Sequence, residues 1–535
     1  MSRKESQPDG SQKEGVEASE HKVTKSRSLL RSSALVGMMT MLSRVLGLVR
    51  DVVVANYFGA GSSADAFFVA FKIPNFLRRL FAEGAFSQAF VPVLSEYRSL
   101  KDISAVKELV DRVAGSLGLV LMFITALGVL GAPVLAAVFA PGFYINDPLR
   151  YGLAVEMLRF TFPYLLLISL TAFAGSILNS YERFAVPAFT PVLLNLSLIG
   201  AAIWMQPLFD QPVMALALGV LIAGSVQLLF QIPFLWRLQL LPSPKLGFDH
   251  EGVKRILTLM VPALFGVSVS QINLLLDTLL ASFLQTGSVS WLYYSDRLAE
   301  LPLGVFGIAI ATVILPSLSR KHAKRSTDHF SRTLNWAMRM VLLIGMPAAM
   351  ALLVLAEPLI ATLFHYGEMT DRDVMMAAMS LRAYACGLMA FMLIKVLAPG
   401  YFSRQDTKTP VKIGIYAMVV NMALNLLLIG PLDHVGLALA TTLAAFLNAG
   451  LLLRGLIKEG VFSWQPGWLK WLLRMAAANA AMIGFLLLLV DSPEQWLAFD
   501  MWQRISQMAM LVTGGGLIYL MVLLLLGMRL RDLRH

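Results

Sequence analysis

Residues 43–51 read SRVLGLVRD and residues 64–90 read ADAFFVAFKIPNFLRRLFAEGAFSQAF, and these two stretches decide the fold. Both lie in apolar runs long enough to cross a bilayer, which takes about 20 residues. Both nevertheless carry cations, each of which costs about 2.5–3.5 kcal/mol at the bilayer centre even on insertion-based scales. These cations must face a wet cavity or an acidic partner, and a basic cavity suits an anionic ligand. The cations in these two stretches are Arg44, Arg50, Lys72 and Arg78, and a later run of the same kind adds Arg297.

The composition is that of an integral membrane protein. Of the 535 residues, 57% are hydrophobic and 14% are charged, whereas about a quarter of a soluble domain is charged. The net charge of +11 is spread between apolar runs, so orientation in the membrane explains it better than binding to nucleic acid. The single cysteine, Cys386, excludes a disulfide framework, and the seven histidines show no metal-ligand spacing. We therefore expect no cofactor.

Apolar runs of spanning length recur along the chain, so we expect an all-α protein with about 14 transmembrane helices. The runs lie at about 31–57, 63–95, 113–140, 151–180, 185–206, 212–236, 254–284, 288–318, 333–357, 374–402, 410–430, 434–457, 467–490 and 505–528. Residues 1–28 are polar and typical of a disordered cytoplasmic tail.

Lysine and arginine gather in alternate loops. The basic loops are those near 98–112, 237–255, 320–332, 404–412, 454–458 and 529–534. The intervening loops carry only Arg150, Arg372 and Arg504. Because positive loops stay in the cytoplasm, this alternation predicts that both termini are cytoplasmic.

The chain also repeats itself. Asp51 and Gly61 recur 226 positions later as Asp277 and Gly287 (277 − 51 = 226), and the turn at 179–187 resembles the one at 399–410. Two six-helix halves follow, inserted in the same orientation, with a substrate site between them. The expected domains are a tail (1–28), an N-terminal lobe (29–237), a cytoplasmic linker (238–253), a C-terminal lobe (254–458), and two extra helices with a short tail (459–535).

Acidic residues accompany the intramembrane cations at helical spacings. Glu300 follows Arg297 by three residues and Asp296 by four, which places them on one helix face. We expect charge pairs that close one state of the protein and open in another. The candidates are Asp51, Asp65, Glu83, Asp296 and Glu300. The alternative is a structural salt bridge or a side chain that snorkels to the interface, which applies most to Arg79, Glu83 and Asp296.

A second polar group is a candidate sodium site. It combines the carboxylate of Asp277 with amide and hydroxyl oxygens from Asn421, Asn425 and Thr441, next to Thr442. The alternative is ordinary hydrogen bonding between helices. The coupling ion, Na+ or H+, stays open.

At this point a resemblance becomes specific. The two opening stretches, together with GSVSWLYYSDRLAELPLGVFG (287–307) and KVLAPGYFSRQDTKTPVK (395–412), resemble the MurJ/MviN lipid II flippases of Gram-negative bacteria. The similarity covers about residues 29–530. It implies the fold of the multidrug/oligosaccharidyl-lipid/polysaccharide exporters, in which two lobes flank a cationic cavity in the inner membrane. It also implies that the last two helices form a groove for a polyprenyl tail.

The same resemblance implies a function and site residues. Family members carry lipid II, a polyprenyl pyrophosphate with a sugar–peptide headgroup, from the inner to the outer leaflet. The cavity cations would be Arg44, Arg50, Arg78, Arg297 and Lys395, with Asp65 and Glu300 as the acidic partners. We expect a monomer that is not an enzyme, with cell-wall synthesis proteins as candidate partners.

Other functions fit the sequence less well. A drug/cation antiporter of the same fold would need an acidic, aromatic cavity. A flippase for another polyprenyl-linked glycan satisfies the same physics, and only the motifs argue against it. A membrane phosphotransferase would need paired aspartates or a metal site, and a nucleotide-driven pump would need a P-loop; the sequence contains neither pattern.

Overall fold

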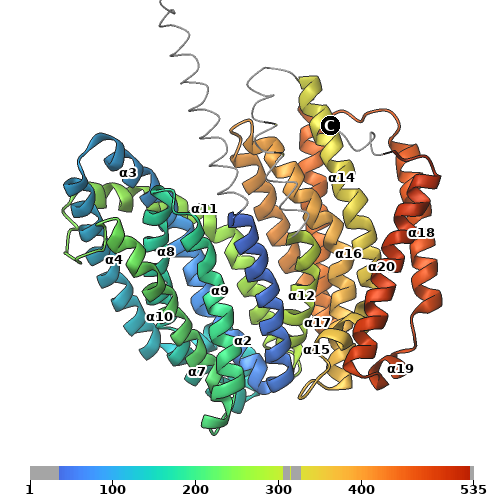
Figure 1. Ribbon diagram of the computed structural model, residues 1–535, viewed down its shortest axis with the longest axis horizontal. Helices are drawn as coiled ribbons and strands as arrows, with labels where there is room; N and C mark the ends of the chain where they lie inside the picture. The colour runs from blue at the N-terminus through green and yellow to red at the C-terminus, as the bar shows by residue number, and fades with distance from the viewer. Residues whose placement is uncertain (1–34, 305–313, 315–317, 319–326, 530–535) are drawn as a thin grey trace, which may run out of the picture.

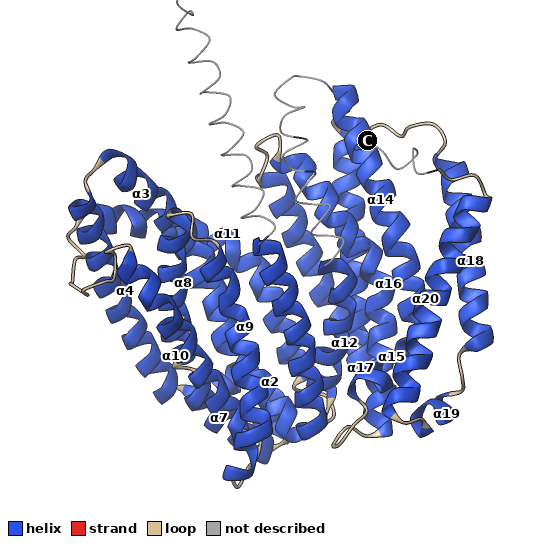
Figure 2. Ribbon diagram, viewed as in Figure 1, coloured by secondary structure: helices blue, strands red, loops and turns tan. Residues whose placement is uncertain are grey.

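The computed structural model describes residues 35–304, 314, 318 and 327–529, in which the regular elements are helices joined by loops, with no strand among them (Figure 2). The helices form two lobes that lie side by side (Figure 1). The first described helix begins and α20 ends at the same end of the bundle, the upper end in Figure 1. We call this the cytoplasmic end, as the loop charges predict, and the opposite end the outer end.

The first lobe runs from residue 35 to Arg237. A helix at 35–58 is followed by α2 (Ser62–Leu77), η1 (Arg78–Phe86), α3 (Ser87–Leu100), α4 (Ile103–Leu130), α5 (Ala132–Phe139), α6 (Pro141–Asn146), α7 (Pro148–Thr161), α8 (Tyr164–Ser180), α9 (Ala185–Gly200), η2 (Ala201–Met205), η3 (Gln206–Leu208) and α10 (Met214–Arg237). α10 packs against α8 and α9, and α2 packs against α7.

The second lobe is built around α16. Its elements are α11 (Glu251–Ala281), α12 (Ser288–Pro302), α14 (Thr327–Val354), α15 (Ala356–Phe364), α16 (Asp371–Phe402) and α17 (Lys408–Lys458). α16 contacts α12, α14, α15 and α17. Beyond this lobe, α18 (Trp468–Leu489), α19 (Pro493–Ala498) and α20 (Met501–Leu525) cover α14 and α15 (Figure 1).

The structure does not confirm the count of 14 transmembrane helices. Nine helices in the described ranges are long and apolar enough to span. One of them, α17, covers two of the predicted runs and is broken at Asp433, where φ is 48° and ψ is −132°. The run at 288–318 lies partly outside the described residues.

The helix α11 links the two lobes. Its first turns pack on α3, where Arg255 Nη1 lies 2.8 Å from Glu96 Oε2, and its last turns pack on α17. α11 ends at Ala281 and α12 starts after Gly287, as the helix at 35–58 ends before Gly61 and α2. The sequence repeat therefore places Asp51 and Asp277 in the last two turns of corresponding helices.

Candidate functional site

A cavity of about 320 Å³ lies between the two lobes and is lined by the helix at 35–58 together with α2, η1, α9, α11, α12, α16 and α17. Its walls carry five cations and three carboxylates. They are Arg50, Lys72, Arg78, Arg79 and Arg297, and Asp277, Asp296 and Glu300. Four of the six cations expected from the sequence lie here, together with Arg79 from the same polar stripe.

A local change of helix type brings adjacent arginines to the cavity wall. α2 contains Pro74, and a π-type turn, η1, begins at Arg78. Successive residues of a π-type turn are separated by a smaller angle than in an α-helix, because each hydrogen bond spans five residues. Arg78 and Arg79 can therefore both line the cavity, and Arg78 Nε donates to Asn75 Oδ1 at 3.2 Å.

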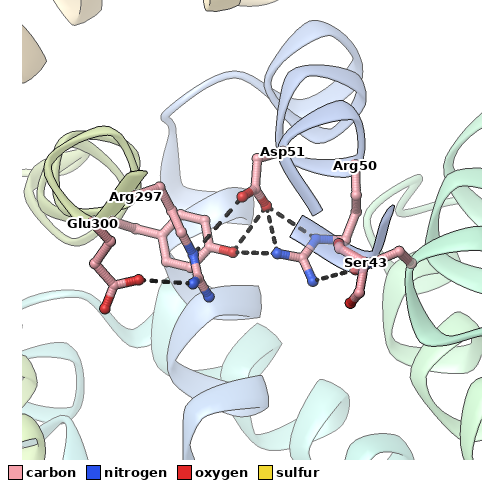
Figure 3. A network of polar contacts seen from close by, with 7 residues as sticks. Ser43, Arg50, Asp51, Arg297 and Glu300 are labelled. Atoms are coloured by element: carbon pink, nitrogen blue, oxygen red, sulfur yellow. Dashed lines mark hydrogen bonds and ion pairs between the residues drawn. The ribbon is translucent and has the colours of Figure 1, made fainter. Parts of the chain in front are cut away.

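A charge network crosses the lobe interface beside this cavity (Figure 3). Arg50 donates from Nη2 to Asp51 Oδ1 at 2.7 Å, and both side chains are buried. The Tyr293 hydroxyl donates to the same carboxylate oxygen at 2.9 Å. Arg297 Nε lies 3.8 Å from Asp51 Oδ2, and Arg297 Nη1 donates to Glu300 at 3.3 Å. Asp51 of the first lobe is thus shared with α12 of the second.

Two residues of this network were missed by the sequence analysis. Tyr293 also accepts from Arg50 Nη2 at 3.0 Å, and its ring stacks on Phe68 with centroids 4.0 Å apart. Asn195 of α9 accepts from Arg50 Nη1 at 3.0 Å and donates to the Ser43 carbonyl at 2.9 Å. Neither is charged, so a search for intramembrane charges could not find them; the only signal for Tyr293 was its place in the YYSDR stretch.

Asp65 lies outside the cavity, at the outer end of the lobe interface, and is fully buried. Its carboxylate accepts hydrogen bonds from Gly287 N at 2.7 Å, Ser290 N at 2.9 Å and Ser290 Oγ at 2.7 Å. These donors form the start of α12, where exposed amides favour an anion. Arg150 Nη1 lies 3.1 Å from the same carboxylate.

The position of Arg150 corrects one sequence assignment. The sequence placed this residue in an outer loop, but its side chain is only 4% exposed. It pairs with Asp65 and Asp147 and lies over the ring of Phe143, 4.2 Å from the centroid. Asp65 lies 85 residues from Arg150 in the sequence, so counting loop charges could not reveal this buried pair.

Further contacts close the outer end. Tyr294 donates to the Gly59 carbonyl at 2.9 Å, and Glu368 N donates to the Asn56 carbonyl at 3.0 Å. Gly367 has a φ of +58°, and a Cβ there would come within 2.1 Å of the Asn56 carbonyl oxygen. A glycine is therefore required for this approach of the two lobes.

Three expected site residues are placed elsewhere or not described. Arg44 is not among the residues lining the cavity. Its guanidinium packs against the backbone of Gly304 across the lobe interface, where an added Cβ would lie 1.7 Å from Arg44 Nη1. Lys395 is exposed on α16 and does not line the cavity. The side chain of Glu83 lies outside the described residues.

The polar residues around Asp277 do come together. Its carboxylate accepts from Asn425 Nδ2 at 2.8 Å, from Asn421 Nδ2 at 3.5 Å and from Thr441 Oγ1 at 3.5 Å. Thr442 points instead to the Ala383 carbonyl, at 2.7 Å. No group of three or more His, Cys, Asp or Glu side chains that could hold a metal occurs within the described ranges. A cation here would therefore depend on one carboxylate and on neutral oxygens.

Comparison with known proteins gives a consistent result. The sequence model of the family "Lipid II flippase MurJ" matches residues 54–506. A probable lipid II flippase MurJ of Vibrio cholerae is 53% identical over 518 residues, which is 96% of this chain and 99% of that protein. A probable lipid II flippase MurJ of Haemophilus influenzae is 50% identical, over 92% of this chain and 98% of that protein.

Solved structures that resemble this chain include a member of the same family. A lipid II flippase MurJ in an inward closed conformation matches with a TM-score of 0.77 and 27% identity, over 91% of this chain and 98% of that one. A multidrug MATE transporter in an inward-facing conformation matches with a TM-score of 0.65 and 16% identity, over 80% of this chain and 98% of that one, which shows a shared fold. The matched family consists of transporters, not enzymes. This multi-pass membrane protein belongs to the lipid II flippase MurJ family.

Proposed function

We propose that the chain moves lipid II from the cytoplasmic to the periplasmic leaflet by alternating access, using the cavity between its lobes. The observation that carries this proposal is the charge network on the cavity wall, in which Arg50 and Arg297 share Asp51 across the lobe interface. A pyrophosphate needs several cations at once. Arginine suits it because the guanidinium binds phosphate oxygens in pairs and stays charged when desolvated.

The substrate would compete with the protein's own carboxylates. Arg297 is half-exposed to the cavity and contacts Asp51 only at 3.8 Å. Its Glu300 partner is 52% exposed, so this second contact is weakly held. A pyrophosphate that takes over Arg297 would loosen the link between Asp51 and α12. Ligand binding and lobe movement are coupled in this way without any covalent step.

The outer end must open for release, and Asp65 is the principal contact to break. In the closed state it joins α2 of the first lobe to the start of α12 in the second. The inside-negative potential supplies about 2.3 kcal/mol per charge per 100 mV. Outward movement of an anionic headgroup, or return of the arginines inward, would follow that field.

The group around Asp277 is our candidate for a coupling-ion site. The carboxylate and the Thr441 hydroxyl provide two oxygens, and Asn425 Oδ1 is buried without a hydrogen-bond partner in the described structure. Rotation of the Asn425 amide would present that oxygen to a sodium ion. The alternatives are a proton on Asp277 or plain interhelical hydrogen bonding. Sodium-dependent thermal stability that disappears in Asp277→Asn would support the ion.

We further propose that the protein is a monomer in the inner membrane with both termini in the cytoplasm. The alternation of loop charge supports this orientation. Cell-wall synthesis proteins that supply or consume lipid II are the candidate partners.

The test is lipid II translocation in cells depleted of their resident flippase. Wild type is expected to restore translocation, and Arg50→Ala, Arg297→Ala and Asp65→Ala are expected to lose it at matched expression. Arg454→Ala, an exposed cation outside the cavity, serves as the control. A well-expressed wild type that restores no translocation would refute the assignment and favour another polyprenyl-linked glycan.

A further inference from the structure

A second cavity, of about 300 Å³, lies at the cytoplasmic end of the first lobe, away from the charge network. It is enclosed by the start of the helix at 35–58, the turn between α8 and α9, and the end of α10. Its charged residues are Glu182, Arg183 and Arg237. Its apolar residues are Leu35, Phe184, Ala185, Val186, Phe234 and Leu238. We call it the α8–α10 cavity.

The two cations of this cavity form no ion pair within the described part of the chain. Arg183 and Arg237 are exposed, and neither forms an ion pair with any described carboxylate, including the neighbouring Glu182. The guanidinium of Arg237 lies 5.9 Å from the ring centroid of Phe234. Two arginines therefore border a partly apolar hollow with their charges available.

The internal repeat supplies a comparison for this turn. The turn between α8 and α9 corresponds to the one between α16 and α17, because Glu182 and Gln405 both have positive φ values, 60° and 63°. These positions are 223 apart (405 − 182 = 223), as are the starts of α9 and α17. By the same offset, Arg183 corresponds to Asp406 (406 − 183 = 223).

The second half neutralises its own turn. Asp406 Oδ1 accepts from Thr409 N at 3.0 Å at the start of α17, and the hydrogen bonds from Thr409 lower the pKa of Asp406. Arg404 pairs with Glu459 at 2.7 Å, which closes the turn against the end of α17.

The first half differs in charge at two of these positions. Arg183 stands where the second half has Asp406, and Leu238 follows α10 where Glu459 follows α17. Two positions that are acidic in the second half are therefore basic or apolar in the first, and this difference favours an external anion beside Arg183 and Arg237.

We propose that the α8–α10 cavity binds the phosphate of an anionic membrane phospholipid, held by Arg183 and Arg237. The apolar rim at Leu35, Phe184 and Phe234 suits the adjoining glycerol and upper acyl chain. Basic pockets between membrane helices on the cytoplasmic side are typical sites for such headgroups. This cavity lies within the first lobe, away from the interface between the lobes, so we assign it to a resident lipid and not to the transported one. The proposal rests on the orientation given above.

The test is native mass spectrometry of the full-length protein titrated with dioleoyl phosphatidylglycerol, with dioleoyl phosphatidylcholine as the neutral probe. The Arg183→Gln/Arg237→Gln variant is expected to bind phosphatidylglycerol roughly 25-fold more weakly, since each basic residue near an anionic lipid contributes about fivefold. The matched control is Arg454→Gln/Lys458→Gln, which removes two exposed cations from the corresponding end of α17.

Three results would overturn the proposal: equal loss in both double variants, no loss in either, or displacement of the lipid by inorganic phosphate alone. Lipid II binding is measured on the same samples. Its retention in the Arg183→Gln/Arg237→Gln variant shows that the protein is folded, and separates this site from the transport cavity. If the wild-type protein does not bind lipid II, the proposed function is refuted, whereas the phospholipid result is unaffected.

Discussion

Asp65→Ala should open the outer end of the protein. Asp65 makes two kinds of contact, and they affect different equilibria. The ion pair with Arg150 lies within the first lobe, where α2 and α7 pack together, so its loss is expected to lower the stability of both states. The hydrogen bonds from Gly287 and Ser290 cross to the second lobe and exist only while the outer end is closed.

The size of the effect follows from the contacts between the lobes. A hydrogen bond to a charged group contributes about 1.5–3 kcal/mol, and bonds that share one carboxylate do not add fully. We therefore assign about 3 kcal/mol to the three bonds from Gly287 and Ser290 together. Since 1.4 kcal/mol is a factor of ten, the ratio of closed to open outer ends should fall roughly 100-fold. Ser290→Ala removes one of the three hydrogen bonds and should lower the ratio of closed to open outer ends by about tenfold.

The assay is the distance between spin labels at Leu149→Cys in α7 of the first lobe and Glu494→Cys in α19, which packs on α15 of the second lobe; both positions are exposed and lie at the outer end. Cys386, the single native cysteine, is first replaced by serine. Asp65→Ala is expected to add a population at longer distance. Arg150→Gln is the control, because it should lower the melting temperature without a comparable change in distance. An Asp65→Ala distribution identical to that of wild type would refute the reasoning.

Three other predictions follow from single side chains. Tyr293→Phe keeps the stack on Phe68 but removes the hydroxyl shared by Arg50 and Asp51, so translocation should fall about tenfold at unchanged expression, measured with labelled lipid II; full activity would contradict this role. Asp277→Asn should abolish any difference in melting temperature between sodium and potassium buffers, and a difference that persists would place the ion elsewhere. Arg504→Met should destabilise the protein by about 3 kcal/mol, because the buried guanidinium donates to four backbone carbonyls around α15 and α19. Thermal unfolding measures this change, and lipid II binding by the folded variant should be unaffected.

Much of the fold was predictable from the sequence. Most of the apolar runs coincide with described helices, and the repeat placed Gly61 and Gly287 before corresponding helices, as the structure has them. The boundary at Asp433 between two predicted runs is a break inside α17. The helix count was less predictable, because polar residues such as Lys72 and Arg79 lower the hydropathy of helices that line a cavity.

The candidate site was predictable where a charge had to be kept away from lipid. Arg50 and Arg297 were found for this reason, and the structure places both on the cavity wall. Lys395 was inferred only from a resemblance, and it lies exposed on α16, outside the lining of this cavity.

The sequence by itself determined that this is a helical membrane protein with two repeated halves and cations between them. These conclusions depend on the cost of placing charge in hydrocarbon, and this cost can be judged from each stretch of sequence on its own. Only the tertiary structure decided the partners: that Asp65 joins α12, that Arg150 is buried beside it, and that Tyr293 bridges Arg50 and Asp51. Hydrogen bonds and ion pairs act over about 3 Å, so they depend on how distant helices pack, which no local pattern contains.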